Sequence, residues 1–125
     1  MPVAAAVALA VVVVVGLALL GLRPGPSADL ERVVAGRPTS PRAAFTEAGI
    51  TASRACVFGP YSTEDAIADE LGFAWEEAAS TGIDVSDAYE LVVAADAERV
   101  IAWALVTRPS GSDLVRGEYG CRPVG

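Results

Sequence analysis

The chain opens with an apolar segment, residues 3–22, that has no charged or strongly polar side chain. As an α-helix its 20 residues span roughly 30 Å, at about 1.5 Å per residue, which matches the hydrocarbon core of a membrane. A buried helix of a soluble domain is rarely this long without a polar residue. The segment therefore predicts a single transmembrane anchor at residues 1–22, which leaves residues 23–125 for one small domain.

A cleaved signal peptide is the main alternative for this segment. Such a peptide has a basic stretch before a shorter apolar core and small residues at its cleavage site. Here only Met-Pro precedes the run, and residues 19–28, LLGLRPGPSA, lack small residues at the required spacing. We therefore expect an uncleaved anchor that holds the protein in the membrane through residues 3–22.

The domain that follows the anchor is acidic. All 16 acidic and all 9 basic residues lie after residue 22, and the formal net charge is −7. Such a surface repels the phosphates of nucleic acids, so we expect no nucleic-acid partner. Every basic residue is an arginine, and this lysine-free, alanine-rich composition is typical of GC-rich bacterial genomes. We therefore expect a protein of the bacterial cell envelope.

The residue types that are missing exclude several catalytic chemistries. The chain has no histidine, which excludes Ser-His-Asp and Cys-His catalysis and histidine-ligated zinc. It has no lysine, which excludes Schiff-base chemistry and the Walker A phosphate loop. We predict no catalytic residues, no cofactor, no metal ligands and no enzymatic activity.

The chain has two cysteines, Cys56 and Cys121, which are too far apart in sequence for a C-x-x-C redox motif. A structural zinc site normally has four cysteine or histidine ligands, and here there are two. The remaining possibilities are a disulfide or two buried thiols. We favour a disulfide that ties the C-terminal tail to the first strand, with two free thiols as the alternative.

The cysteines and the arginines give opposite orientations for the domain. Arg23, Arg32, Arg37 and Arg42 follow the anchor, and the positive-inside rule then places the domain in the cytoplasm. A disulfide forms and persists in oxidising compartments outside the cytoplasm. We favour the extracytoplasmic side.

Residues 23–49 are interpreted as a stalk with short helices, because prolines and glycines interrupt them. Ser40 is placed to cap one such helix, with Pro41 at its first position and Gly49 after its end. Residues 50–125 are interpreted as a compact α+β domain. It begins with a strand near Cys56, followed by a helix capped by Ser62 and by a second helical piece at residues 73–81.

The strongest structural signal is a β-hairpin at residues 89–107. Residues 89–95 and 100–107 are rich in Val, Ile, Tyr and Trp, and four turn-like residues separate them. Both faces of the second strand are apolar, which predicts a central strand that is covered on both sides. The element order predicts a helical layer on a short antiparallel sheet.

Two alternatives to a non-catalytic binding or scaffolding domain, with an envelope protein as its partner, stay open. A carboxylate-based hydrolase would use one of the close acidic pairs, although surface carboxylates are usually only solvated. The pairs are Asp65/Asp69, Glu76/Glu77 and Asp84/Asp87. A small-ligand or lipid-binding module would line a cleft with aromatic rings, although such rings are more often core. The aromatic candidates are Phe58, Tyr61, Phe73, Trp75, Tyr89 and Trp103.

Overall fold

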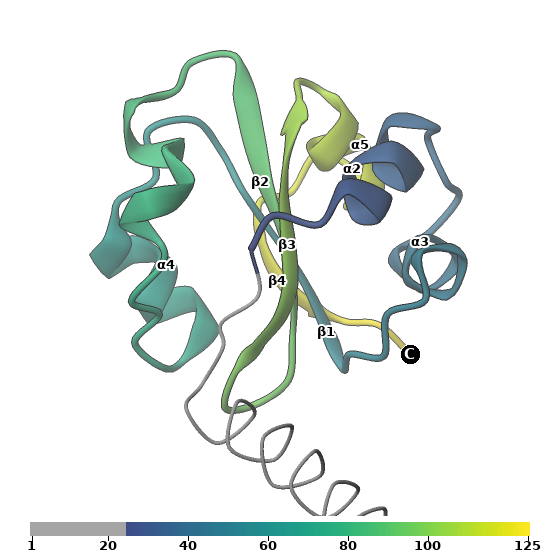
Figure 1. The fold of residues 1–125 in the computed structure, drawn as a ribbon, viewed down its shortest axis with the longest axis horizontal. Helices are drawn as coiled ribbons and strands as arrows, with labels where there is room; N and C mark the ends of the chain where they lie inside the picture. Colours follow the sequence, from purple (N-terminus) through teal and green to yellow (C-terminus); the bar gives the residue numbers. More distant parts are fainter. Residues whose placement is uncertain (1–24) are drawn as a thin grey trace, which may run out of the picture.

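The fold is a four-stranded antiparallel sheet with helices packed on both faces (Figure 1). In the computed structural model residues 25–125 are described, and their α+β class confirms the sequence prediction. The predicted anchor, residues 3–22, lies outside these residues. Within residues 25–125 no helix has the length and apolarity needed to cross a membrane. The strands follow the order β3-β2-β1-β4, with β1 Arg54–Phe58, β2 Tyr89–Ala95, β3 Val100–Thr107 and β4 Gly120–Pro123.

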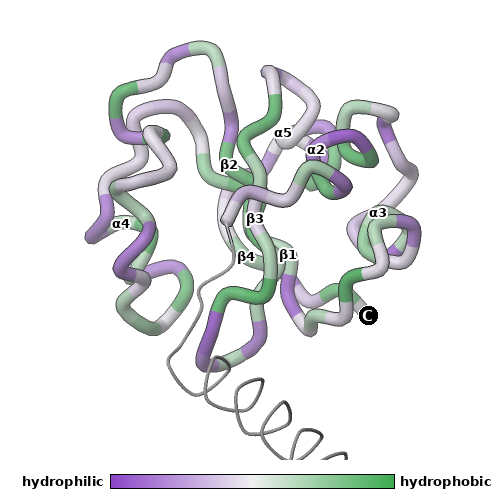
Figure 2. Tube along the Cα trace, in the orientation of Figure 1, coloured by the Kyte–Doolittle hydropathy of each residue, from purple (hydrophilic) through white to green (hydrophobic). Residues whose placement is uncertain are grey.

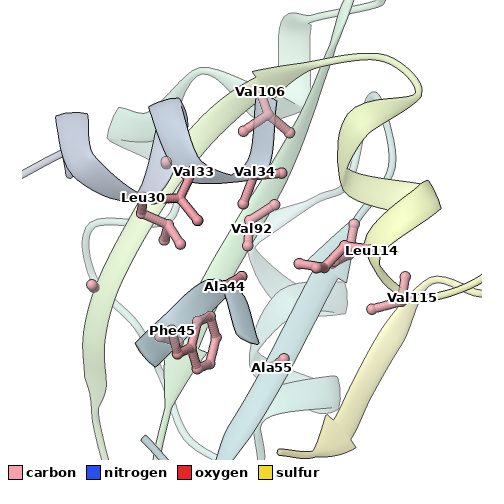
Figure 3. Packing of buried hydrophobic residues seen from close by; sticks show 14 residues of the cluster. Leu30, Val33, Val34, Ala44, Phe45, Ala55, Val92, Val106, Leu114 and Val115 are labelled. Atoms are coloured by element: carbon pink, nitrogen blue, oxygen red, sulfur yellow. The ribbon is translucent and has the colours of Figure 1, made fainter. Parts of the chain in front are cut away.

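One face of the sheet is covered by α2 (Ala28–Ala35), α3 (Pro41–Ala48) and α5 (Ser110–Leu114) (Figure 1). The apolar side chains of α2 and α3, among them Leu30 and Phe45, are buried in one cluster with Ala55 of β1 and Val92 of β2 (Figure 3). Ser27 and Ser40 cap these two helices through hydrogen bonds from the backbone N–H groups of the first turns. Residues 28–48 therefore share a core with the sheet, and the packed unit begins near Pro26 rather than at residue 50.

The other face of the sheet is covered by α4 (Glu64–Leu71) and by two short 3₁₀ turns, η1 (Ala79–Thr81) and η2 (Ile83–Val85). Ile67 and Leu71 of α4 are buried, while hydrophilic residues lie on its outward side (Figure 2). Trp75 meets Trp103 of β3 edge-to-face, with ring centroids 6.1 Å apart. The sequence predicted one helical layer, whereas the structure has a layer on each face of the sheet.

Two local predictions around α4 are wrong. The cap of α4 is Thr63, whose hydroxyl accepts the N–H of Ala66, whereas the hydroxyl of Ser62 donates to the carbonyl of Gly59. Residues 73–81 form turns and a single 3₁₀ turn rather than a helix. Burial of Trp75 and Ala78 against the sheet holds this segment in an irregular path.

The hairpin of β2 and β3 is confirmed at the expected residues. Asp96 closes its turn, because its carboxylate accepts the N–H groups of Glu98 and Arg99. The central position expected for β3 is wrong, since β3 lies at the edge of the sheet. Helices and turns cover both faces of this edge strand. Apolar residues on both faces of a strand therefore indicate that both faces are covered, and they do not distinguish a central strand from an edge strand.

Both edges of the sheet make contacts that protect them from other strands. Pro26 forms a parallel bridge with Trp103 at the edge of β3, and Ser27 donates its N–H to the Trp103 carbonyl. At the edge of β4, the Glu70 carboxylate accepts the N–H of Cys121 at 2.9 Å. Because the bridge at Pro26 is parallel, the chain enters the fold from the Val100 end of β3, where the β2–β3 turn lies.

Candidate functional site at the tyrosine-bearing end of the sheet

The disulfide predicted from the sequence is confirmed. Cys56 and Cys121 are directly opposed on β1 and β4, with an S–S distance of 1.99 Å and a Cα–Cα distance of 4.0 Å. Neither cysteine is free, so the alternative of two free thiols is wrong. The bond fixes the short strand β4 to the interior strand β1, and it thereby places the segment just before β4 at one end of the sheet.

The large apolar side chains that remain exposed within residues 25–125 gather at that end. Their exposed fractions are 60% for Tyr61, 78% for Val85, 41% for Tyr89 and 48% for Tyr119. We call these four residues the distal surface. Tyr61 follows β1, Val85 and Tyr119 precede β2 and β4, and Tyr89 is the first residue of β2. The β2–β3 turn lies at the opposite end of the sheet (Figure 1).

Backbone contacts bring three members of the distal surface together. Tyr61 donates its N–H to the carbonyl of Ile83 at 2.9 Å, which places Tyr61 beside η2 and its exposed Val85. The β1–β2 register pairs Phe58 with Leu91, and its continuation by two residues places Tyr89 opposite Pro60. Tyr61, Val85 and Tyr89 therefore surround the turn that follows β1.

Tyr119 crosses the same turn from the other side. A Cβ placed on Gly59 would lie 2.7 Å from the Tyr119 ring, so this ring lies directly on the glycine backbone. The Tyr119 hydroxyl donates to Oε2 of Glu90 at 2.7 Å. Gly59 thus lets a side chain from the start of β4 pass over the end of β1 and reach β2.

Glu90, which was not among the predicted site residues, is the carboxylate that anchors this arrangement. Its side chain is 0% exposed, and its Oε1 accepts the N–H groups of Gly111 and Ser112, both at 3.0 Å. With Tyr119 on Oε2, three donors satisfy the buried carboxylate. Glu90 therefore fixes α5 and Tyr119 to β2 and serves a structural role. The signal in the sequence was an acidic residue inside an apolar strand.

The pKa of Tyr119 is raised above its ordinary value of 10.0, first by the hydrogen bond to Glu90 and then by burial, while Arg108 opposes the shift. The folded state therefore favours the neutral phenol. We expect the free energy of unfolding to fall as the pH rises above about 10, the ordinary tyrosine pKa, and through the higher pKa of the folded state. Denaturant titrations over this alkaline range would measure the fall in the free energy of unfolding. In Tyr119→Phe the part of this fall that comes from ionisation of Tyr119 should be absent. If the free energy of unfolding of Tyr119→Phe fell with pH as steeply as that of the native protein, the raised pKa of Tyr119 would not be its cause.

Gly59→Ala is expected to lower the free energy of unfolding by about 1 to 3 kcal/mol, a typical result of overpacking. The new methyl group would displace the Tyr119 ring and its hydrogen bond to Glu90. Urea unfolding would measure the change, and Gly25→Ala, with open space around the added methyl, is the control. In a Tyr119→Ala background Gly59→Ala should cost much less; an equal cost there would contradict the explanation.

The acidic pairs considered for hydrolysis lie mainly on the surface, unlike the buried Glu90. Asp65 and Asp69 are exposed on α4, and Asp84 and Asp87 are exposed around η2. Glu76 is exposed and Glu77 half-buried in the turns before η1. Among residues 25–125, no three acidic or cysteine side chains cluster in a way that could hold a metal ion.

The aromatic residues considered for a ligand cleft divide between the core and the surface. Phe58, Trp75 and Trp103 are buried between the sheet and α4, with Phe73 half-buried beside them. Tyr61 and Tyr89 are exposed on the distal surface. Comparisons with models of protein families, with curated proteins and with solved structures found no match. The function is therefore inferred from the residues and their geometry.

Proposed function

We propose that this protein is a single-pass membrane-anchored protein of the bacterial envelope, whose domain binds a protein partner outside the cytoplasm. The apolar sequence of residues 3–22 supports the anchor. The Cys56–Cys121 disulfide supports an oxidising compartment. The domain then acts by binding or scaffolding rather than by catalysis.

The observation that carries the proposal is the gathering of exposed apolar side chains on the distal surface. Scattered exposed apolar residues are ordinary, but a group of them at one place marks an interaction site. Tyrosine is among the residues enriched at protein interfaces, because its ring is large and rigid and its hydroxyl tolerates water. The tyrosines of the domain, Tyr61, Tyr89 and Tyr119, all belong to this surface.

The position of the distal surface fits a partner rather than the bilayer. The chain enters the fold from the β2–β3 turn end of the sheet, as the parallel bridge between Pro26 and Trp103 requires. With an anchor at residues 3–22, the distal surface lies on the side of the domain away from that attachment. A negatively charged domain is also repelled by anionic lipid headgroups.

Site-specific photo-crosslinking in the native membrane tests the binding role. A photoreactive amino acid at Val85, which is 78% exposed, should give a discrete higher-mass product that contains the partner. The same amino acid at Glu47, exposed on α3, is the control and should not give that product. Identical patterns at both positions, or no product at Val85 at native expression, would count against a binding surface at this end.

Thiol alkylation tests the compartment. Free thiols are blocked during lysis of cells that carry the full chain, and the denatured protein is weighed before and after reduction. Resistance of both cysteines to the first block, in a monomeric chain, is the expected result. Immediate blocking of both cysteines would place the domain in the cytoplasm, in agreement with the positive-inside rule.

A further inference from the structure

We infer that the partner meets the distal surface with a basic protein face, whose arginine or lysine side chains lie against the exposed tyrosine rings. This inference rests on the proposed function and adds the chemistry of the partner. It follows from the charges that surround the four apolar side chains.

Each member of the distal surface has an exposed carboxylate nearby in the chain. The segments at this end, residues 59–64, 83–89, 107–110 and 116–119, carry four exposed acidic residues and two arginines, Arg108 and Arg116. The acidic residues are Glu64, Asp84, Asp87 and Glu118, and each lies within three positions of Tyr61, Val85, Tyr89 or Tyr119. The surface therefore joins apolar rings to a net negative rim.

Arg108, one of the two arginines of these segments, is already engaged within the domain. Arg108 donates to the backbone carbonyl of Asp87 at 3.4 Å, and it also acts on the hydroxyl of Tyr119. Its charge therefore offsets part of the rim. Glu118 is already paired with Arg122 at 3.7 Å, so the carboxylates that a partner can reach are those of Glu64, Asp84 and Asp87. A partner that supplies cations would pair with the remaining carboxylates and stack on the rings, since arginine and lysine are attracted to the faces of aromatic rings.

The same charges disfavour a second copy of this chain as the occupant. A symmetric dimer formed through the distal surface would bring identical acidic rims together, and the whole chain carries a formal charge of −7. Like charges facing one another across an interface weaken association. A basic partner removes this repulsion and gains steering toward the surface.

Binding of a labelled peptide of alternating arginine and glycine to the full chain in a zwitterionic detergent tests the inference. We expect saturable binding that weakens with salt, and no binding of the matching glutamate–glycine peptide. Asp84→Asn with Asp87→Asn should weaken binding roughly tenfold, the effect of losing one energetically important contact region. Tyr61→Ser with Tyr89→Ser, which leaves the charge unchanged, should weaken it by a similar factor.

The matched control removes the same charge elsewhere. Glu31→Gln with Glu47→Gln acts on exposed residues of α2 and α3 and should change binding by less than about twofold, since distant exposed charges are screened. Equal weakening by this pair and by the Asp84/Asp87 pair would show diffuse attraction and overturn the inference. Undiminished binding by the tyrosine variant would also overturn it.

Competition in the native membrane separates this inference from the proposed function. The arginine–glycine peptide should suppress the crosslinked product formed from position 85. If the crosslinked product persists at a saturating concentration of the peptide, the proposed binding function is retained but the inference of a basic partner is wrong. Absence of any product at position 85 overturns both.

Discussion

Reduction of the Cys56–Cys121 disulfide is expected to lower the free energy of unfolding by about 4 kcal/mol. The bond joins residues 65 positions apart, and the chain-entropy estimate for closing a loop of this length is about 4 kcal/mol. The loss is large relative to the stability of a small domain, typically about 5 to 15 kcal/mol. Urea unfolding of the full chain in mild detergent, with and without reductant, would measure it.

The structure also predicts where the effect is felt first. β4 has four residues and pairs with β1 alone, so without the disulfide its ends should fray and Tyr119 should leave Glu90. Hydrogen exchange at β4 would report this local opening. A Cys56→Ala, Cys121→Ala variant should be insensitive to reductant. A shift below about 1 kcal/mol on reduction of the native protein, well under the usual range for disulfides, would contradict the stabilising role.

Glu90→Ala is expected to lower the free energy of unfolding by about 3 kcal/mol. The substitution leaves the N–H groups of Gly111 and Ser112 without their acceptor, and a buried donor without a partner costs about 1 to 3 kcal/mol. It also opens a cavity beneath α5. Urea unfolding at neutral pH would measure the loss.

Glu90→Gln is the matched variant, because its side chain has the same shape. Its amide oxygen can accept both N–H groups and its NH₂ can donate to Tyr119, so only the charge-assisted strength is lost, about 1 kcal/mol. Equal effects of Glu90→Ala and Glu90→Gln would assign the stability to the charge instead of to the hydrogen bonds. A neutral Glu90→Ala would contradict the structural role of this residue.

The sequence predicted those parts of the fold that depend on local patterns. The bounds of β2 and β3 follow from β-branched and aromatic residues on either side of a polar turn. Ser40 capping and the left-handed Gly49, with φ 72°, follow from helix-end chemistry. Elimination of a redox motif and of a zinc site left a disulfide or two free thiols, and the structure decides for the disulfide.

The errors arose where distant segments decide the structure. β3 lies at the edge because β1 pairs with the other side of β2, and no pattern within residues 100–107 reveals that choice. Residues 73–81 fail to form a helix because Trp75 packs against Trp103. These are tertiary contacts that override local preference.

The candidate site was the least predictable part of the chain. Glu90 and its partner Tyr119 are 29 positions apart, and only the fold places the ring of Tyr119 over Gly59. The exposed tyrosines were each visible in the sequence, but their common location depends on the sheet register and on the contact between Tyr61 and Ile83. Neither the sheet register nor the contact between Tyr61 and Ile83 can be predicted from a local sequence pattern.

The covalent link between β1 and β4 also determines how the domain responds to mechanical load. A force that pulls the two ends of the chain apart is carried past residues 57–120 through the sulfur atoms, because those residues lie inside the closed loop. Only the segments outside the loop can be drawn out, which include α2 and α3. Tyr61, Val85, Tyr89 and Tyr119 all belong to the shielded part, so their arrangement persists while α2 and α3 are drawn out.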